Sequence, residues 1–360
     1  MSIAAKTAAE PKGATRGSFL NKQLKPLIVS ALFTLFVFWL MTIYLRPMTD
    51  FVLTSLRDGS KEINAPRIPS SPVTFEYQGE VFEVYKVPID GQTRDLALVR
   101  KGRTQSVFID PANPTQEITW EGRWRTLDRA WVVNPQWKNY PEAWKQIDYP
   151  KLLRNTFIIA IMSTIGAVLS AIVVAYGFSR FAIPGKNIWM SILMATIILP
   201  PQVTIVPTYI MFFQIGWVPS MLPLIVPAFF GSAWNIFLLR QFFMNIPKEL
   251  DEAAMIDGAN PMRILWSIIV PLSWPAIIAV AINSFLYNWN DFFNQILYLA
   301  GREDLRTISP GIQSFNSVYG AANPQYVAAA AIIASILPII LFFAAQRPFM
   351  RAVMTQGVDK

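Results

Sequence analysis

Six long apolar stretches dominate the hydropathy pattern of this chain, and polar segments of very different length separate them. A helix needs about 20 mostly apolar residues to cross a hydrocarbon core about 30 Å thick. The stretches lie at 26–46, 155–178, 187–212, 222–243, 267–289 and 325–346. The pattern predicts an all-α membrane protein with six transmembrane helices. A composition of 53% hydrophobic and 15% charged residues agrees with it.

Basic residues are concentrated before the first apolar stretch, which predicts how the chain is oriented. Five lysines and arginines precede residue 26, whereas the loop 214–221 carries no charge. Because positive residues stay on the cytoplasmic side, we expect residues 1–25 to form a disordered cytoplasmic tail. Six crossings return the tail 347–360 to the same side. This orientation accounts for much of the net charge of +8, so nucleic acid is not expected as a partner.

The longest polar segment, 47–130, has the pattern of β-structure. Residues 73–77 and 81–85 alternate apolar and polar side chains around a turn at 78–79, which is the period of a β-hairpin. We expect a small β-rich extracytoplasmic domain inserted between the first and second helices. Residues 131–154 are rich in aromatic residues and prolines. They predict an interfacial linker with a short helix, because Trp and Tyr favour the membrane surface.

Prolines interrupt the last four apolar stretches and predict bent helices. Proline removes a backbone hydrogen bond, and the freed carbonyl groups then need another partner or water. Bends of this kind favour a bundle that lines a pathway, although they also occur in static bundles. The prolines are Pro200, Pro201, Pro207, Pro223, Pro227, Pro271, Pro275 and Pro338.

Several residue types and motifs that carry chemistry are absent from the sequence. There is no cysteine and no histidine, which excludes disulfides, zinc sites built from these residues, and histidine acid-base catalysis. No GxxxxGK[ST] phosphate-binding loop occurs either, so ATP-Mg would have to be bound by another subunit. We predict no catalytic residue, no metal site and no resident cofactor, and hence a protein that is not itself an enzyme.

A charged stretch between the fourth and fifth apolar segments, 245–261, has strong helix signals. Each ionised residue would cost about 2.5 to 3.5 kcal/mol at the centre of a bilayer, so the stretch must lie outside the membrane. Asn245 near the N-cap, Pro247 in the first turn and Gly258 at the end predict a helix at about 247–258. A helix this short is marginal alone and should be stabilised by docking. One face combines Leu250, Ala253, Ala254 and Asp257. The alternative is an amphipathic connector on the membrane surface.

The order of residues in this stretch matches a known motif. Glu252-Ala253-Ala254, three residues, Gly258, nine residues and then Ile268-Ile269-Val270-Pro271 resembles the EAA motif of ABC importer permeases. In that family the motif is the coupling helix, which fits a groove on the cytoplasmic ATPase. The resemblance implies that Glu252 positions the helix on the ATPase, Ala253 and Ala254 allow close packing, and Gly258 permits the turn into the next helix.

Further motifs extend the resemblance to about residues 132–355. The chain is similar to the carbohydrate importer permeases of the maltose-transporter type, and most of all to the MalG-like subunit. The motifs are Asn155-Thr156, Phe178-Ser179-Arg180, Leu199-Pro200-Pro201-Gln202, Arg240-Gln241-Phe242-Phe243 and Trp289-Asn290-Asp291-Phe292.

The resemblance implies a fold, a location and a set of partners. The fold is that of a type I ABC importer permease, with its core at 155–346, in the bacterial cytoplasmic (inner) membrane. The partners are membrane lipid, a second, MalF-like permease subunit, a dimer of ATPase subunits that binds ATP-Mg, and an extracytoplasmic substrate-binding protein. The insertion 47–130 departs from the family pattern.

Polar residues near the outer end of the fifth apolar stretch are candidates for the substrate pathway. Asn283, Tyr287 and Asp291 recur at a spacing of four residues, with Asn290 beside them. Amides and an aromatic face suit a neutral sugar, but such amides also bond neighbouring helices. The span centres lack charged residues, which argues against proton or sodium coupling. Import of a polyol or glycerol phosphate, and a membrane sensor with an extracytoplasmic ligand domain, are the alternatives.

The segment 301–322, between the fifth and sixth stretches, is predicted to face outward. It is rich in Gly, Ser and Asn. In MalG-like subunits the corresponding loop reaches into the binding protein, which makes Gln313 and Tyr319 candidates for contact with that partner. A solvated loop is the alternative.

Overall fold

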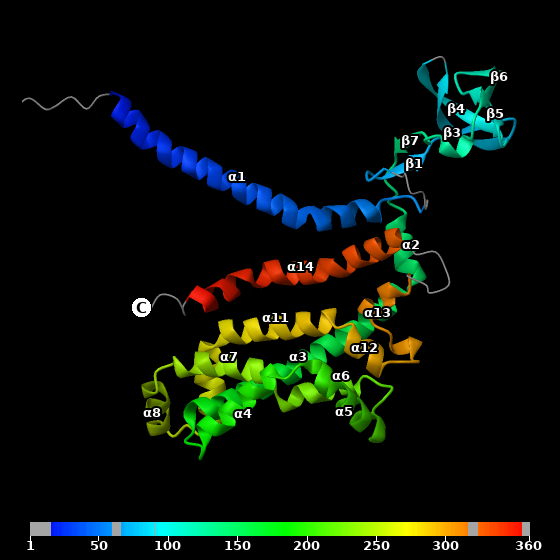
Figure 1. Ribbon diagram of the computed structural model, residues 1–360. Coiled ribbons are helices and arrows are strands. Elements are labelled where there is room, and N and C mark those ends of the chain that lie inside the picture. Colours follow the sequence, from blue (N-terminus) through cyan, green and yellow to red (C-terminus); the bar gives the residue numbers. More distant parts are fainter. Residues whose placement is uncertain (1–15, 60–65, 90, 316–322, 355–360) are drawn as a thin grey trace, which may run out of the picture. The chain divides into compact units, whose positions relative to one another are not determined.

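The computed structural model describes residues 16–59, 66–89, 91–315 and 323–354 (Figure 1). The chain forms two compact units, Met1–Leu53 and Thr54–Lys360. The first holds most of helix α1 (Arg16–Ser55). The apolar side chains of α1 from Leu27 to Val52 are exposed, as expected of a helix whose surroundings are lipid or another protein.

The long apolar stretches of the sequence form helices, but two of the six stretches are sharply bent. By length and composition, four helices of the described residues can cross a membrane, or up to six segments if each of two bent pairs is one span. The four single spans are Pro26–Ser55, Tyr149–Arg180, Leu222–Met244 and Pro324–Ala344. This is the helical membrane-protein fold that the hydropathy pattern predicts.

The two bent pairs have their breaks at or between prolines. Helix α4 (Lys186–Ile198) and helix α5 (Pro201–Gln214) meet at 97°, and the break is at Pro200-Pro201. The segment Pro261–Leu272 meets helix α11 (Trp274–Asn290) at 82°, and the break lies between Pro271 and Pro275. The missing N–H groups of proline interrupt the hydrogen-bond ladder at these points. The sequence predicted kinks here, but not their size.

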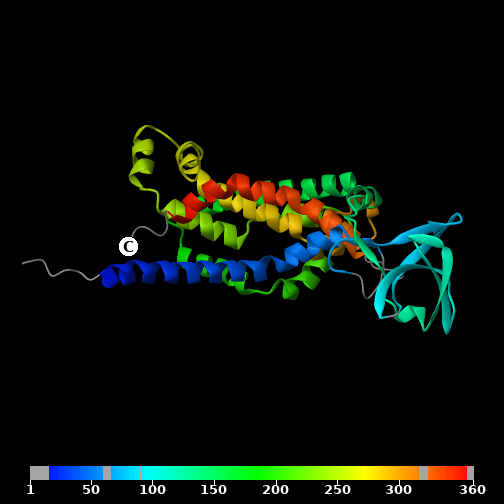
Figure 2. The same ribbon diagram turned by 90° about the horizontal axis from the view of Figure 1, so that it is seen from above.

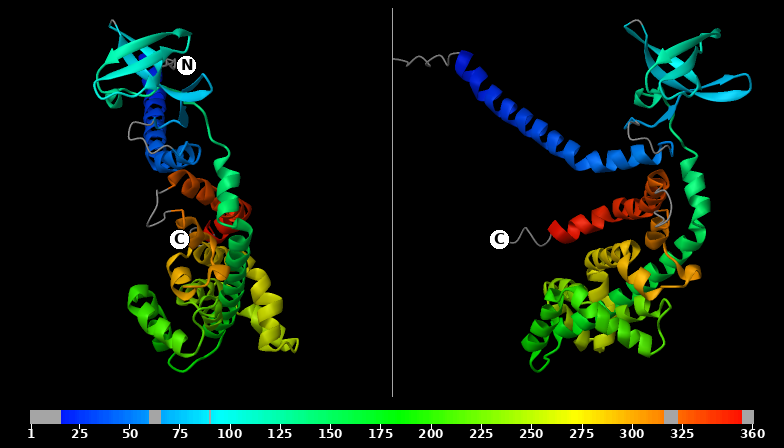
Figure 3. Two further views of the ribbon diagram at one scale, coloured as in Figure 1. Left: turned by 90° about the vertical axis from the view of Figure 1, so that its right-hand side faces the viewer. Right: turned by 45° about the vertical axis from the view of Figure 1, so that its right-hand side comes forward.

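A β-rich region occupies Ser70–Val133. Its five-stranded sheet is antiparallel in the order β2-β3-β4-β5-β6, and β1 pairs with β7. Figure 3 shows the sheet strongly curled. The elements are β1 (Ser70–Pro72), β2 (Thr74–Tyr77), β3 (Glu80–Ile89), β4 (Gln92–Arg100), β5 (Gln105–Asp110), β6 (Asn113–Glu121), η1 (Trp124–Thr126) and β7 (Trp131–Val133).

The first hairpin of this region forms where the alternating pattern predicts it. Phe75 pairs with Phe82 across β2 and β3. Both turn residues have positive φ, 53° at Gln78 and 82° at Gly79, and such turns match the twist of the two strands. The core of the sheet contains Leu96 and Phe108, which are fully buried.

Helix α2 (Asn139–Gln146) connects the β-rich region to the helices. Asn139, which is buried, donates hydrogen bonds to the carbonyl oxygens of Ser55 and Arg57, both at 2.8 Å. Trp144 stacks on Tyr149 with ring centroids 4.4 Å apart, whereas Trp137 is 67% exposed. The linker therefore combines a buried polar anchor with exposed aromatic surface.

The helical core is built around helix α3 (Tyr149–Arg180), which packs against α7 (Ala233–Met244) and α11. Small residues of α3, Ala171 and Ala175, are fully buried and permit close approach of these helices. The remaining helical elements are α6 (Leu222–Ile225), η2 (Val226–Phe230), α7 (Ala233–Met244), α8 (Glu249–Ile256), α9 (Pro261–Ile264), the π-helical turn η3 (Leu265–Ile269), α10 (Val270–Leu272), α12 (Phe293–Tyr298), η4 (Glu303–Leu305), α13 (Ile308–Gln313) and α14 (Pro324–Met354).

Two chemically distinct regions lie at opposite ends of this core. Helix α8 is at one end, and α12 and α13 are at the other (Figures 1 and 2). Both regions belong to the unit Thr54–Lys360.

Candidate functional site

The charged stretch forms a short helix that crosses the end of the core. Helix α8 spans Glu249–Ile256, within the limits predicted for it. The expected cap at its start is wrong. Asn245 is the C-cap of α7, and Lys248 takes the N-cap position of α8 without a side-chain hydrogen bond. A link of three residues that contains Pro247, Ile246–Lys248, separates the two helices, so α8 begins later than a cap at Asn245 would place it.

Gly258 ends α8 as its sequence position predicts. Its φ is +79°, the left-handed region that an L side chain adopts only with strain. The N–H of Ala259 donates to the carbonyl oxygen of Ala254 at 2.9 Å, and the N–H of Gly258 donates to that of Met255 at 3.0 Å. This pair of bonds is a Schellman motif, which turns the chain sharply toward α9.

The predicted docking residues of α8 do not all lie on the exposed side. Glu252, Ala253 and Asp257 are exposed, and Leu250 is 42% exposed. Ala254 instead is partly buried and packs against the hydrophobic cluster shared by α3, α7 and α11. The four-residue face expected from helical spacing is therefore split between the surface and the core.

Two exposed apolar residues of α8 were missed by the pattern. Met255 is 53% exposed and Ile256 is 87% exposed. They lie beside the exposed acidic residues at the end of α8. A sequence signal was available, because helical spacing places Met255 and Ile256 away from the face that holds Leu250 and Ala254.

The sequence also gave no indication of a buried ion pair that holds α8. Arg180, the last residue of α3, lies 2.6 Å from Asp251 through its Nε and the carboxylate Oδ2. Both side chains are about nine-tenths buried, with 7% and 10% exposed. The guanidinium also donates to the carbonyl oxygen of Ile246 at 2.9 Å. The available signal was a lone cation at the end of a span, in the motif Phe178-Ser179-Arg180.

At the other end of the core, the four predicted pathway residues line one open hollow. Asn283, Tyr287, Asn290 and Asp291 surround it together with Leu286, Phe292 and Phe293, and its volume is about 530 Å³. Tyr287 is 66% exposed. Asn290 donates to the carbonyl oxygen of Leu286 in its own helix, and Asp291 accepts from the N–H of Asn294 at 3.2 Å.

Other amides of the same region bond neighbouring parts of the chain. The buried Asn235 donates to Ser284 Oγ at 3.1 Å, which joins α7 to α11. Gln295 of α12 donates to the carbonyl oxygen of Asn288 in α11, whereas the side chain of Asn288 donates to the carbonyl oxygen of Ser284 within α11 itself. The structure thus separates two kinds of polar residue in this helix, those that bond the bundle and those that face the hollow.

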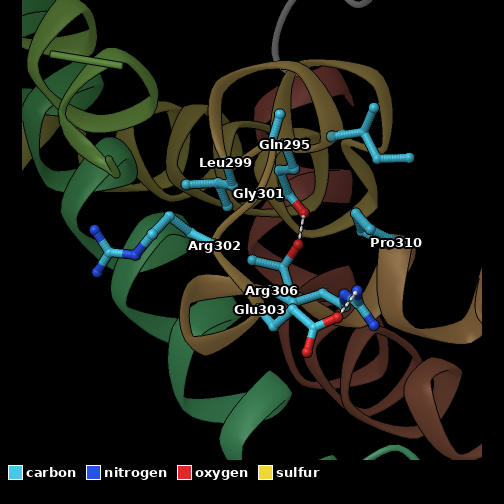
Figure 4. Close-up of a pocket in the computed structure, with 10 residues that line it drawn as sticks. Gln295, Leu299, Gly301, Arg302, Glu303, Arg306 and Pro310 are labelled. Carbon is cyan, nitrogen blue, oxygen red and sulfur yellow. Dashed lines mark hydrogen bonds and ion pairs between the residues drawn. The ribbon is translucent and has the colours of Figure 1, made fainter. Parts of the chain in front are cut away.

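A second, smaller cavity lies between α12 and α13, with a volume of about 220 Å³ (Figure 4). Its two arginines each have a carboxylate partner. Arg302 holds Asp304 through two contacts at 2.8 and 2.7 Å, which lowers the pKa of Asp304 to about 2. Arg306 lies 3.3 Å from Glu303. The cavity therefore presents little uncompensated charge.

This cavity is fixed to the start of α3 by buried hydrogen bonds. Asn155 donates to the carbonyl oxygens of Asp304 and Arg306, both at 2.9 Å. Thr156 Oγ accepts from the N–H of Ile308 at 3.0 Å. Inside the cavity wall, the hydroxyl of Thr307 donates to Gln295. These contacts give the motif Asn155-Thr156 a structural role.

The predicted contact loop is only partly described. Gln313 is the last residue of α13, so it belongs to a helix and not to an irregular tip. Tyr319 lies outside the described residues. Among the residues that the structure describes, no group of three or more Asp and Glu side chains is arranged to hold a metal ion.

The comparisons with known proteins agree on one class. Residues 167–354 match the family model described as binding-protein-dependent transport system inner membrane component. The osmoprotective compounds uptake permease protein GgtD of Synechocystis sp. is 28% identical over 276 residues, which is 76% of this chain and 92% of that protein. The sn-glycerol-3-phosphate transport system permease protein UgpE of Yersinia pestis is 33% identical over 225 residues, which is 61% of this chain and 79% of that protein.

One solved structure shares the fold over nearly the whole chain. It is a bacterial ABC transporter involved in the import of the acidic polysaccharide alginate, with a TM-score of 0.60. The two chains are 17% identical, and the match covers 94% of this chain and 99% of that one. At this level of identity the likeness shows the architecture alone.

Proposed function

The chain belongs to the family of binding-protein-dependent transport system inner membrane components, and from that membership we propose that it forms half of the transmembrane pathway for a sugar and is driven by a separate ATPase through α8. It is a permease subunit of a binding-protein-dependent ABC importer. The observation that carries the coupling role is the exposed surface of α8, where apolar and acidic side chains lie together outside the spans.

The chemistry of that surface favours a protein partner over lipid. Met255 and Ile256 leave apolar area uncovered, and such area marks sites of association. A membrane surface would also cover apolar residues, but the neighbouring Glu249, Glu252 and Asp257 are exposed acids. The cytoplasmic leaflet carries negative charge and repels them. A groove in a protein accommodates both kinds of residue.

The proposed topology counts each bent pair as one span. That gives six transmembrane helices with both termini in the cytoplasm, α8 in the cytoplasm and Ser70–Val133 outside. The concentration of basic residues before residue 26 supports this orientation. The partners are then a second, MalF-like permease, a dimer of ATPase subunits that binds ATP-Mg, and an outer binding protein, for which Gln313 lies in a candidate contact segment.

The open hollow supports a polar, uncharged solute. Asn283 and Tyr287 offer an amide and an aromatic ring, the groups that recognise sugar hydroxyls and ring faces. Glycerol phosphate is the second candidate, because a relative 33% identical is named for its transport. Arg302 and Arg306, which line the smaller cavity, are candidates for a phosphate, but each is already paired with a carboxylate. A sugar or polyol therefore fits better.

A single substitution on α8 tests the coupling role. With Glu252→Ala we expect the complex to lose at least 10-fold in uptake of radiolabelled maltose or sn-glycerol-3-phosphate, whichever the wild type imports, and to retain less ATPase on purification. Glu80→Ala, which removes an exposed carboxylate from the β-rich region, is the control and should leave both unchanged. Full uptake and full ATPase retention in Glu252→Ala would contradict the proposal.

A further inference from the structure

The ion pair between Arg180 and Asp251 joins α8 to the end of α3, across 71 positions of sequence. Asp251 is the buried residue of α8, whose other residues are exposed or partly buried. Charged side chains are almost never buried unless they are paired. The 2.6 Å approach of Arg180 Nε to Asp251 Oδ2 supplies the pairing. One face of a short charged helix is therefore held inward by charge.

Arg180 holds the chain at a second point as well. Its Nη2 donates to the carbonyl oxygen of Ile246 at 2.9 Å, in the link that precedes α8. The approach of Nε to Asp251 is an ion pair and not a hydrogen bond, because Nε has no hydrogen-bond partner within the described part of the chain. The hydrogen bond of Nη2 fixes the direction of the link, and the ion pair holds the distance of α8. A single side chain of α3 thus sets the position of both the entry to α8 and its first turn.

Packing alone gives α8 little hold on the core. From α8 itself, Ala254 is the residue that reaches the hydrophobic cluster, and it is only partly buried. Ile246 before the helix and Ala259 after it reach the same cluster from the flanking segments. An alanine methyl group contacts few atoms and resists sliding weakly. The hydrogen bond and the ion pair of Arg180 are what distinguish one position of α8 on α3 from the adjacent positions.

The pair is also incompletely hydrogen-bonded, which argues against a role in stability alone. Asp251 Oδ1 and Arg180 Nε are both buried, and neither has a hydrogen-bond partner within the described part of the chain. Buried pairs of this kind are often no more stabilising than apolar residues of the same shape. Their best-attested use is to specify one arrangement over others.

We propose that Arg180 is a positioning residue that fixes α8 on α3, so that displacement of α8 by the ATPase moves α3 as one body with it. The proposal rests on the proposed function of α8 as the coupling helix. Without Arg180, α8 can still bind the ATPase through its exposed side, but its movement is absorbed by slippage against the core.

The test uses the natural absence of cysteine from the chain. Phe293→Cys, at a position 60% exposed in the hollow, reports accessibility through its rate of labelling by a membrane-impermeant maleimide. The full complex is reconstituted in nanodiscs, and labelling of the permease is followed with and without ATP-Mg and vanadate. In the reporter with Arg180 intact we expect the nucleotide to change the labelling rate at least 5-fold.

Three variants are compared in that reporter background. For Arg180→Gln and Asp251→Asn we expect retained ATPase subunits and continued ATP hydrolysis, but a change in labelling rate below 1.5-fold. Arg180→Lys keeps the positive charge, but a single ammonium group replaces the separate Nε and Nη2 contacts, so it should restore part of the response. Arg129→Gln, which breaks a 2.8 Å ion pair with Glu83 in the β-rich region, is the control and should respond like the reporter alone.

Each result decides the proposal. A normal nucleotide response in Arg180→Gln would overturn it, because hydrolysis and movement would still be linked without the pair. Loss of ATPase binding in both single variants and in Arg180→Met with Asp251→Leu would also overturn it, since the pair would then serve folding. If the reporter with Arg180 intact fails to retain an ATPase, the proposed function of α8 fails first, which distinguishes the two hypotheses.

Discussion

The two ends of the helical core expose opposite kinds of side chain. At the α8 end, Met255 and Ile256 are exposed while an Arg and an Asp are buried. At the α12 end, Asn283 and Tyr287 are exposed beside a hollow. The buried polar side chains there, Asn235 and Ser284, bond each other within the bundle. The first arrangement suits a permanent protein contact that must keep its shape. The second leaves hydrogen-bonding groups free for a transient solute.

The largest expected effect comes from the turn after α8. Gly258→Pro fixes φ near −65°, whereas the residue has +79°, and it removes the N–H that binds Met255. The Schellman motif cannot form, so we expect uptake to fall at least 100-fold and the ATPase to be lost on purification. Asn260→Ala removes only the cap of α9 and should cost far less. Retained uptake in Gly258→Pro would mean that the geometry of this turn does not matter for coupling.

A smaller effect is expected from the apolar surface of α8. Ile256→Glu places a charge where a protein groove should cover an isoleucine that is 87% exposed here. Truncation of a contact residue at the centre of an interface costs about 2 kcal/mol or more, which is roughly a 30-fold weaker association. We expect ATPase retention to fall accordingly while the thermal stability of the permease is unchanged. Ile68→Glu, at a position 56% exposed in the second unit, is the control. Equal retention in both variants would remove Ile256 from the interface.

The smallest effect is expected in the hollow. Asn283→Ala and Tyr287→Ala each remove a group able to contact solute, and a typical hydrogen bond contributes about 1 kcal/mol. We expect KM for uptake to rise about 5- to 10-fold with ATPase retention unchanged. Asn294→Ala, next to the hollow but bonded to Asp291, provides the comparison. If Tyr287→Ala lowers ATPase retention and not apparent affinity, the contrast between the two ends is wrong.

Local features of this fold follow from the sequence because they depend on a few adjacent residues. The positive φ of Gly258 and the turn at Gln78-Gly79 each depend on a glycine, which tolerates left-handed backbone. The β-rich region and the helical spans follow from periods of apolar residues in the same way. In each case the residues that predict the element are the same residues that form it.

Features that depend on residues far apart in the chain did not follow from the sequence. Helical spacing placed Ala254 on a face with Leu250, but it cannot say where the core ends, and the core covers Ala254. Arg180 and Asp251 come together only when α3 and α8 are assembled. The same holds for Ser284 and Asn283, which are adjacent in one helix: Ser284 accepts from Asn235 of α7, whereas Asn283 lines the hollow.

The length of α3 has a mechanical consequence. Asn155 near its start is tied to residues 304–306, and Arg180 at its end is tied to α8. The helix contains no internal proline between these two points, and 25 residues at 1.5 Å each give a rod about 38 Å long. A rigid rod of that length converts a tilt of about 5° at one end into a displacement of roughly 3 Å at the other. An angular change too small to disturb the packing of the bundle is then large enough to open or close a path for a small solute.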